Sequence, residues 1–235
     1  MANLYVDFVS DEDFLECIKW VCSAYPDVSE EVDIEDLKRN AIDPFKLVFD
    51  LVNGKTTVDL WVKSESMRQD DKTINNKIGE FHQKLLGKVK GWEDLKTGSK
   101  YAVDLRRTDN SIFIELKNKW NTMNSGGIKE CHQRLKVLSK SFPKARCYWA
   151  YLIGKDGTSG EEVWLYNNKT NKNIKQVWGG KVYEIVTGDP ESLSKTWRAL
   201  PKAINHLKNS DFELNDAEQQ KLSAFFEASF GEKSL

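Results

Sequence analysis

The segment that most constrains the fold runs from Tyr101 to Trp120 and reads YAVDLRRTDNSIFIELKNKW. It holds two runs rich in β-branched and aromatic residues, 101–107 and 111–120, which is the composition of β-strands. Between the runs lies Asp109-Asn110, a pair that suits a two-residue turn with positive φ. The segment therefore predicts a β-hairpin.

The register of this hairpin decides which side chains meet. If Asp109 and Asn110 form the loop, Asp104 falls directly opposite Glu115. Opposed Cβ atoms lie about 4.5–5.5 Å apart, and two carboxylates that close repel each other unless a cation lies between them. Side chains alternate along a strand, so Lys117 shares the face of Glu115. The pattern predicts a divalent metal held by Asp104 and Glu115, with the ammonium group of Lys117 beside it.

A solvated charge pair on a surface sheet is the alternative reading of the same residues. The run 111–120 argues against a solvated pair. Ile112, Ile114 and Leu116 occupy one face of this strand, and Phe113 places an apolar side chain between the charged residues of the other. This pattern predicts strands that are buried on both faces, where unpaired charges are costly and usually functional. The backbone carbonyl of Leu116 is a candidate third metal ligand.

The spacing of these residues resembles the core motif of the PD-(D/E)XK nuclease superfamily. Val103-Asp104 is followed by ten residues and then by Glu115-Leu116-Lys117. Val103 replaces the usual proline, which is not a ligand. Three longer segments resemble bacterial type II restriction endonucleases that cut GGNCC-type sites: IGEFHQKLLGKVKGW at 78–92, IELKNKWNTMNS at 114–125 and VYEIVTGDPESL at 182–193. The resemblance spans roughly residues 73–207.

This resemblance implies an α/β fold with a restriction-endonuclease-like core, in which helices flank a mixed β-sheet. It implies Mg²⁺-dependent, site-specific hydrolysis of double-stranded DNA, with Asp104 and Glu115 as ligands and Lys117 assisting. It also implies that the helix acid Glu80 reaches the metal site through water, although a solvated acid is the default reading of that residue. Such enzymes read palindromic sites as two-fold dimers, so a homodimer is expected here.

The charge distribution agrees with a nucleic-acid partner. Residues 1–43 hold twelve acidic and three basic residues, whereas residues 44–210 hold thirty basic and eighteen acidic ones, so a total charge of −1 conceals a basic centre. A basic surface of this kind attracts the phosphate backbone, although a solvated surface of mixed charge is an equally good reading of charge alone.

Other classes of site and location find little support in the sequence. The four cysteines have no CxxC pairing and the three histidines lie far apart, which disfavours a zinc site or a disulfide scaffold. The acidic N-terminus lacks a signal-like apolar run, and no stretch approaches the ~18 apolar residues of a membrane span. We expect a cytoplasmic bacterial protein with reduced thiols.

Three regions are expected along the chain. Residues 1–70 form an N-terminal helical region, residues 71–210 hold the catalytic core with its DNA-contacting loops, and residues 211–235 hold a C-terminal helix. Further elements are predicted by caps and by apolar spacing. These are a helix from Ser10 to Ala24, a helix from Asp43-Pro44 to Val52, a long helix whose stripe runs from Ile74 to Trp92, a helix with a stripe from Ile128 to Phe142, a strand from Ala145 to Ile153, and a hairpin turn at Gly154 to Gly160.

Two segments are candidates for DNA contact. The first, KWNTMNSGG at 119–127, ends in a glycine pair that permits close backbone approach to a ligand. The second, NNKTNKNIKQVWGGK at 167–181, reads as a lysine-rich and amide-rich loop. Ordinary turns or a disordered surface loop are the alternatives. The residues singled out in these segments are Lys119, Asn121, Thr122 and Asn124, then Lys172 and Lys175, with Lys169 and Gln176 as more distant readers.

Two other functions stay open at this point. One is a PD-(D/E)XK nuclease of repair or junction resolution, which sequence-independent cleavage of branched DNA would reveal. The other is a non-enzymatic DNA-binding protein in which Asp104, Glu115 and Lys117 form a structural salt bridge. Stability without metal, together with an absence of nicking, would favour that reading.

Overall fold

The computed structural model describes residues 3–25, 44–54, 56–96 and 98–231. The chain divides into two compact units. The first, called here the catalytic unit, consists of residues 1–19 and 79–235, and the second consists of residues 20–78. Helix α4 (Val58–Gly87) contributes residues to both units.

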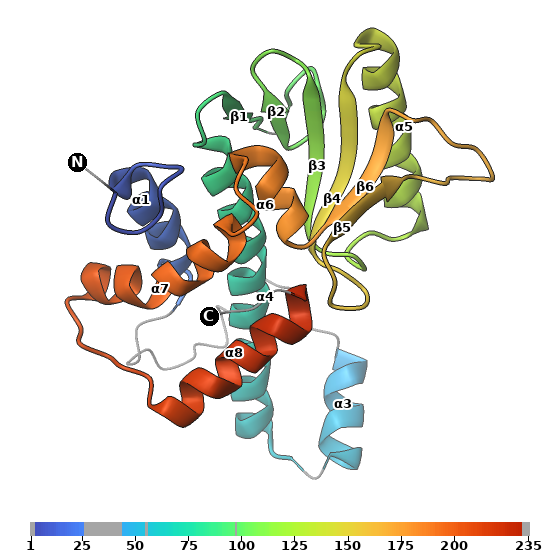
Figure 1. The fold of residues 1–235 in the computed structure, drawn as a ribbon. Coiled ribbons are helices and arrows are strands. Elements are labelled where there is room, and N and C mark those ends of the chain that lie inside the picture. Colours follow the sequence, from blue (N-terminus) through green and yellow to red (C-terminus); the bar gives the residue numbers. More distant parts are fainter. Residues whose placement is uncertain (1–2, 26–43, 55, 97, 232–235) are drawn as a thin grey trace. The chain divides into compact units, whose positions relative to one another are not determined.

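A mixed β-sheet forms the centre of the catalytic unit (Figure 1). Its six strands lie in the order β1-β2-β3-β4-β6-β5. The three central strands β3, β4 and β6 are parallel, whereas β1, β2 and β5 join the edges in antiparallel pairs. The strands are β1 (Trp92–Asp94), β2 (Leu105–Arg107), β3 (Ile112–Lys119), β4 (Arg146–Ile153), β5 (Gly160–Val163) and β6 (Ile174–Trp178).

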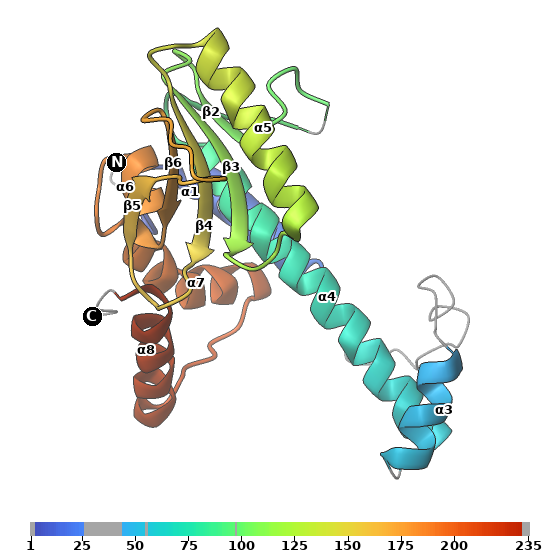
Figure 2. The ribbon, with the colours of Figure 1, turned by 90° about the vertical axis from the view of Figure 1, so that its right-hand side faces the viewer.

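Helices cover both faces of this sheet, which confirms the predicted α/β class. Figure 2 shows α5 (Ser125–Ser141) on one face and α6 (Gly180–Thr187) on the other. Beneath α5, the helix residues Cys131 and Leu135 pack with Phe113 and Trp149 of the sheet in one buried cluster. Helices α7 (Ser192–Lys208) and α8 (Asp216–Phe230) follow α6. Residues Ile112 to Leu116 of β3 are buried throughout, as the hydrophobic run of this strand predicted.

Two helices near the N-terminus begin where the sequence predicted. Helix α1 (Asp11–Cys22) is capped by Ser10, whose hydroxyl oxygen accepts the Asp13 N–H at 3.1 Å, and it ends two residues before the predicted Ala24. Helix α3 (Pro44–Asn53) begins at the predicted Pro44, while Asp43 lies outside the described residues.

The predicted long helix was wrong at both ends. Helix α4 begins at Val58 and stops at Gly87, so Val89 and Trp92 lie beyond it. Both residues are buried, and Trp92 opens strand β1. Their spacing reflects burial in the core rather than a helical stripe, and Gly91, at φ +86°, turns the chain between them.

Strand order corrects two further predictions. Residues 154–160 are not a hairpin turn, because β6 lies between β4 and β5. The segment 167–181 is not a single loop, since residues 174–178 form β6 and Gly180 opens α6. Strand β6 contains Lys175 and Gln176, and only its Ile174 and Val177 are fully buried. Its sequence therefore resembles a polar loop. The hairpin in this region is β5–β6, with residues 164–173 as its connection.

The hairpin of β2 and β3 has the predicted register but a different turn. Leu105 pairs with Ile114, as the prediction required. The Asn110 N–H bonds the Arg107 carbonyl at 2.9 Å, and Asn110 alone in this connection has positive φ. The connection is therefore wider than the two-residue turn expected from Asp109-Asn110. Residues 101–104 were predicted as strand but lie outside β2, and Ala102 has φ +52°.

Candidate active site

The hairpin places Asp104 beside Glu115, as the sequence predicted. The Asp104 N–H bonds the Ile114 carbonyl at 3.0 Å, so Asp104 lies just beyond β2 and is still bonded to β3. Lys117 lies on the same face of β3. Its Nζ is 2.9 Å from Glu115 Oε1 and 3.3 Å from Asp104 Oδ2. These three residues form one compact cluster.

Three oxygen atoms converge on the Lys117 ammonium group. Besides the two carboxylates, the Leu116 carbonyl accepts a hydrogen bond from Nζ at 3.0 Å. Two carboxylate oxygens and one peptide oxygen are hard ligands of the kind that Mg²⁺ prefers. The cluster therefore offers the donor set of a cation site, and the candidate ligands are those that the sequence predicted.

Protein donors orient each carboxylate through one oxygen. Asp104 Oδ2 accepts the Leu116 N–H at 2.7 Å as well as Lys117. Glu115 Oε1 accepts Arg134 Nη2 at 2.8 Å in addition to Lys117. Within the described ranges, no protein donor bonds Asp104 Oδ1 or Glu115 Oε2. The side chains are thus fixed while one oxygen of each carboxylate stays available to a ligand.

Two acids are a small ligand set. Across the described residues there is no group of three or more His, Cys, Asp or Glu side chains that could hold a metal ion. Mg²⁺ tolerates this, because it commonly binds through one or two carboxylates and keeps several waters. The residues present fit Mg²⁺ rather than zinc, whose sites require three or four protein ligands.

Burial sets the electrostatics of the cluster. Glu115 is only 6% exposed, so its charge depends on its cationic neighbours. Burial raises the pKa of the Asp104 carboxyl above its ordinary value, and the attraction of Lys117 opposes this shift. Burial by itself would lower the pKa of Lys117, but the charges of Asp104 and Glu115 outweigh it and raise that pKa. Lys117 is therefore held protonated beside the two acids.

A pocket of about 570 Å³ opens onto these acids. Its walls are formed by α4, the connection between β1 and β2, and α5. Glu80 of α4 lines this pocket together with Asp104 and Glu115, so the helix acid lies at the same site. Asp94 of β1 lines it too, and its Oδ1 accepts Gln83 Nε2 at 2.6 Å. That Glu80 reaches a metal through water stays a prediction.

Arg134, Asp94 and Gln83 were missed by sequence reasoning. Arg134 directly precedes Leu135, a member of the predicted apolar stripe of α5. A basic residue at the border of a stripe that packs on the catalytic strand could have been found from this spacing. Asp94 and Gln83 carried no comparable signal, because their contact depends on where α4 ends.

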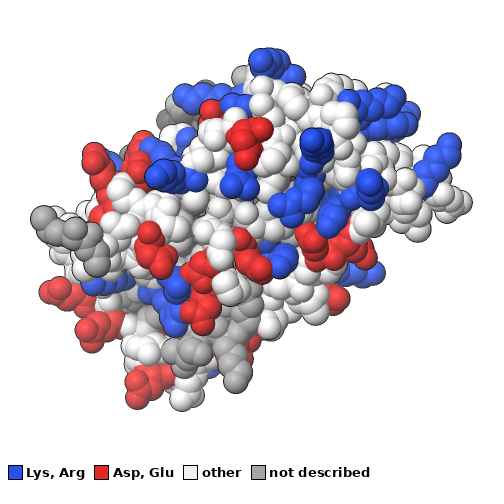
Figure 3. All heavy atoms as spheres, turned by 45° about the horizontal axis from the view of Figure 1, so that its top comes forward, with Lys and Arg blue, Asp and Glu red and all other residues white. Residues whose placement is uncertain are grey.

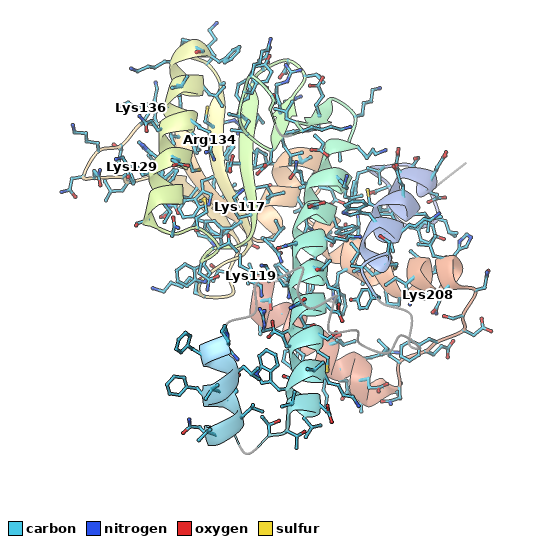
Figure 4. The ribbon with its side chains drawn as sticks, turned by 180° about the vertical axis from the view of Figure 1, so that it is seen from behind. Lys117, Lys119, Lys129, Arg134, Lys136 and Lys208 are labelled. Atoms are coloured by element: carbon cyan, nitrogen blue, oxygen red, sulfur yellow. The ribbon has the colours of Figure 1, made fainter. Side chains whose placement is uncertain are left out.

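The segment after β3 presents the predicted DNA-contacting residues. Lys119, Asn121, Thr122 and Asn124 are all exposed. The Thr122 hydroxyl donates to the Lys119 carbonyl at 2.9 Å, and Asn124 caps α5 by accepting the Gly127 N–H at 2.8 Å. The cap uses only the side-chain oxygen of Asn124. Figure 4 shows Lys119 beyond Lys117 at the end of β3. The glycine pair expected in this loop instead belongs to the first turn of α5.

The two lysines predicted from the later segment differ in their placement. Lys172 is exposed in the β5–β6 connection, and its DNA contact stays a prediction. Lys175 lies in β6 next to Gln176, which aligns with Trp149 and thereby with Glu115. Lys175 therefore points to the opposite face of the sheet, where its Nζ pairs with Glu161 at 2.9 Å. This placement removes the basis for a DNA contact by Lys175 beside the catalytic cluster.

The surface shows a separation of charge. In Figure 3, Lys and Arg side chains gather toward the upper right of the view, while Asp and Glu are more frequent toward the lower left. Among the described residues, no helix has the length and apolarity to cross a membrane.

Comparison with known proteins identifies the family of the chain. The family model of the Eco47II restriction endonuclease matches residues 6–209. The chain is 30% identical over 217 residues to the type II restriction enzyme Sau96I of Staphylococcus aureus, covering 87% of this chain and 82% of that protein. It is 32% identical over 213 residues to the type II restriction enzyme Eco47II of Escherichia coli, covering 86% of this chain and 87% of that protein. The chain therefore belongs to the Eco47II restriction endonuclease family and is a type II restriction endonuclease.

Proposed function

We propose that this restriction endonuclease hydrolyses double-stranded DNA with Mg²⁺ at a GGNCC-type palindrome. The observation that carries the proposal is the convergence of three oxygens, from Asp104, Glu115 and Leu116, on the ammonium group of Lys117, with both carboxylates lining a pocket. When bound, Mg²⁺ supplies an activated water and neutralises charge on the phosphate. Asp104 and Glu115 hold it in this scheme.

Lys117 has two roles in the proposed reaction. Its protonated amine donates hydrogen bonds, so it orients the attacking water toward phosphorus and stabilises the negative charge that grows on the phosphate oxygens. Asp104 and Glu115 keep the amine in place, because both oxygens lie within 3.3 Å of Nζ. Glu80 lies in the same pocket and would contact the bound metal through water.

DNA recognition falls to exposed residues of the segment after β3 and of the β5–β6 connection. Lys119, Asn121, Thr122, Asn124 and Lys172 are the proposed contacts, since Lys donors suit guanine O6 and N7, and Asn serves as a secondary reader. The GGNCC-type site rests on the resemblance of segments 78–92, 114–125 and 182–193. A palindromic site is read by a two-fold dimer, so we propose a homodimer that acts in the bacterial cytoplasm. We also propose that the chain has three regions, which are an N-terminal helical region (1–70), a catalytic core (71–210) and a C-terminal helix (211–235).

The ligand assignment is tested with Asp104→Asn and Glu115→Gln, which keep shape but remove charge. Both variants should lose plasmid cleavage in Mg²⁺ by a factor on the order of 10³, while DNA binding measured without metal stays close to the wild-type value. Asp109→Asn is the matched control, because Asp109 lies in the same hairpin but outside the pocket. A near wild-type cleavage rate in either ligand variant would exclude the assignment.

A further inference from the structure

Arg134 lines the pocket, but the proposed roles of Asp104, Glu115 and Lys117 do not explain why an arginine lies there. It projects from α5 toward the sheet, whereas Lys129 and Lys136 lie on the other side of the helix (Figure 4). Its Nη2 donates at 2.8 Å to Glu115 Oε1, the same oxygen that Lys117 contacts at 2.9 Å. One carboxylate oxygen therefore has two cationic partners.

The guanidinium has more donors than this contact uses. Arg carries five N–H donors in a rigid fork. One donor of Nη2 bonds Glu115, and Nε is buried without an acceptor in the described part of the chain. The side chain is 33% exposed and lines the pocket, so its remaining donors on Nη1 and Nη2 face the open space. The cost of a buried, unpaired Nε at this position is what a binding role for the open donors would offset.

The charges around the pocket indicate which ligand this is. Four acids line it: Glu80, Asp94, Asp104 and Glu115. A DNA phosphate that enters meets their repulsion, which Lys117 offsets only in part because its amine also contacts three protein oxygens. Lys84 and Lys96 also line the pocket, but a lysine amine lacks the planar fork that matches a phosphate. Arg134 alone among these pocket residues combines that fork with a direct contact to a proposed ligand carboxylate.

We propose that Arg134 binds the scissile phosphate of DNA with the open donors of its guanidinium while Nη2 keeps Glu115 in position. This role rests on the proposed reaction at Asp104, Glu115 and Lys117, and it adds a phosphate-binding residue that the sequence motif does not contain. Charge and fork geometry both serve this role, because one arm of the guanidinium holds the carboxylate while the other donors stay directed at a phosphate oxygen.

The test is a double-mutant cycle between Arg134 and the charge of one phosphate. Fluorescence anisotropy without divalent metal measures binding to a duplex with the mapped cleavage site, carrying either the native phosphate or a neutral methylphosphonate at the scissile position. Replacing the native phosphate by the neutral methylphosphonate should weaken DNA binding in both proteins, and about tenfold more in the wild-type enzyme than in Arg134→Gln. A difference of this size is expected of one close charge pair. Lys136→Gln, which removes an exposed charge from the same helix, should behave as the wild type does.

A second readout separates phosphate binding from simple support of Glu115. Arg134→Gln should lower kcat about 10²-fold, the usual size for one preorganised electrostatic donor. Its affinity for Mn²⁺ without DNA should be unchanged or up to roughly tenfold tighter, because a cation leaves Glu115. Arg134→Lys should recover part of kcat and checks that the loss is not a folding defect. A purely supporting Arg134 would instead weaken Mn²⁺ binding together with cleavage.

The outcomes distinguish this role from the proposed function. A wild-type enzyme that cuts DNA in Mg²⁺ but shows no coupling in the cycle would overturn the role of Arg134 and leave the proposed reaction intact. Lower Mn²⁺ affinity in Arg134→Gln would do the same. A wild-type enzyme that cuts no DNA in Mg²⁺ would overturn both.

Discussion

At the scale of single residues, the chemistry depends on how the protein keeps a lysine charged between two acids. Lys117 is partly buried, which by itself favours the neutral amine, yet its contacts with Asp104 and Glu115 restore the charged form. The same contacts stabilise the acids, since Glu115 is almost fully enclosed. A cluster of this kind is stable only as a unit, because removing one partner leaves a buried charge without compensation.

Lys117→Met tests whether this amine takes part in the chemistry. The variant keeps the length of the side chain but removes its charge, and the rate of plasmid cleavage in Mg²⁺ should fall by a factor on the order of 10²–10³. The contrast is Lys119→Met, on the same face but exposed, which should instead reduce the salt slope of DNA binding by about one unit. An unchanged cleavage rate in Lys117→Met would show that the amine is structural only.

At the scale of elements, the pocket depends on where α4 ends against β1. A Cβ on Gly87, the last residue of α4, would lie 2.5 Å from Asp94 Cβ and 2.7 Å from its backbone nitrogen. Helix and strand therefore approach more closely than any other residue would permit. This approach brings Glu80 and Gln83 of α4 to the pocket beside Asp94.

Gly87→Ala should therefore separate α4 from β1. We expect a loss of about 1–3 kcal/mol in the free energy of unfolding, measured by urea denaturation, because backbone atoms must move. Gly79→Ala is the matched control in the same helix, since its Cβ would meet only Asn118 Cβ at 3.7 Å. That control should be neutral or stabilised by up to about 1 kcal/mol, the helix propensity gained. Equal effects of the two substitutions would contradict the close approach.

A second contact between elements makes stability depend on pH. The Nδ1 of His82 on α4 lies 2.8 Å from the Tyr183 hydroxyl on α6, and burial lowers the pKa of His82 to about 4. The unfolded chain binds a proton near pH 6.5 and the folded chain does not, so stability falls as pH drops below 6.5.

Between pH 7 and pH 5 the His82 linkage should cost up to about 2 kcal/mol of unfolding free energy, an upper limit because the residue keeps part of its surface in water. Urea denaturation at the two pH values measures this loss. His82→Gln should be less stable at pH 7 but should lose less stability on acidification. An identical pH dependence in wild type and variant would show that other groups cause the acid sensitivity.

At the scale of the whole molecule, the proposed palindromic DNA site predicts that two copies of the chain act together. A five-base-pair palindrome has its central pair on the two-fold axis, and that pair is tolerated in either orientation, which fits the degenerate N. We expect light scattering to give the mass of a dimer, and sequencing of the cut ends to give a G·C-flanked site cut symmetrically with 5′ overhangs. A consensus without guanine pairs on both flanks would exclude GGNCC-type specificity and leave the nuclease chemistry.

The sequence by itself determined the hairpin, its register and the cluster of Asp104, Glu115 and Lys117. These follow from strand alternation and a short turn, which are local properties of the chain. The position of β6 between β4 and β5, the end of α4 at Gly87 and the contact of Arg134 with Glu115 were decided by tertiary structure. Each of these depends on contacts between segments that are distant in the sequence, and apolar spacing along one segment does not record which distant segment it packs against.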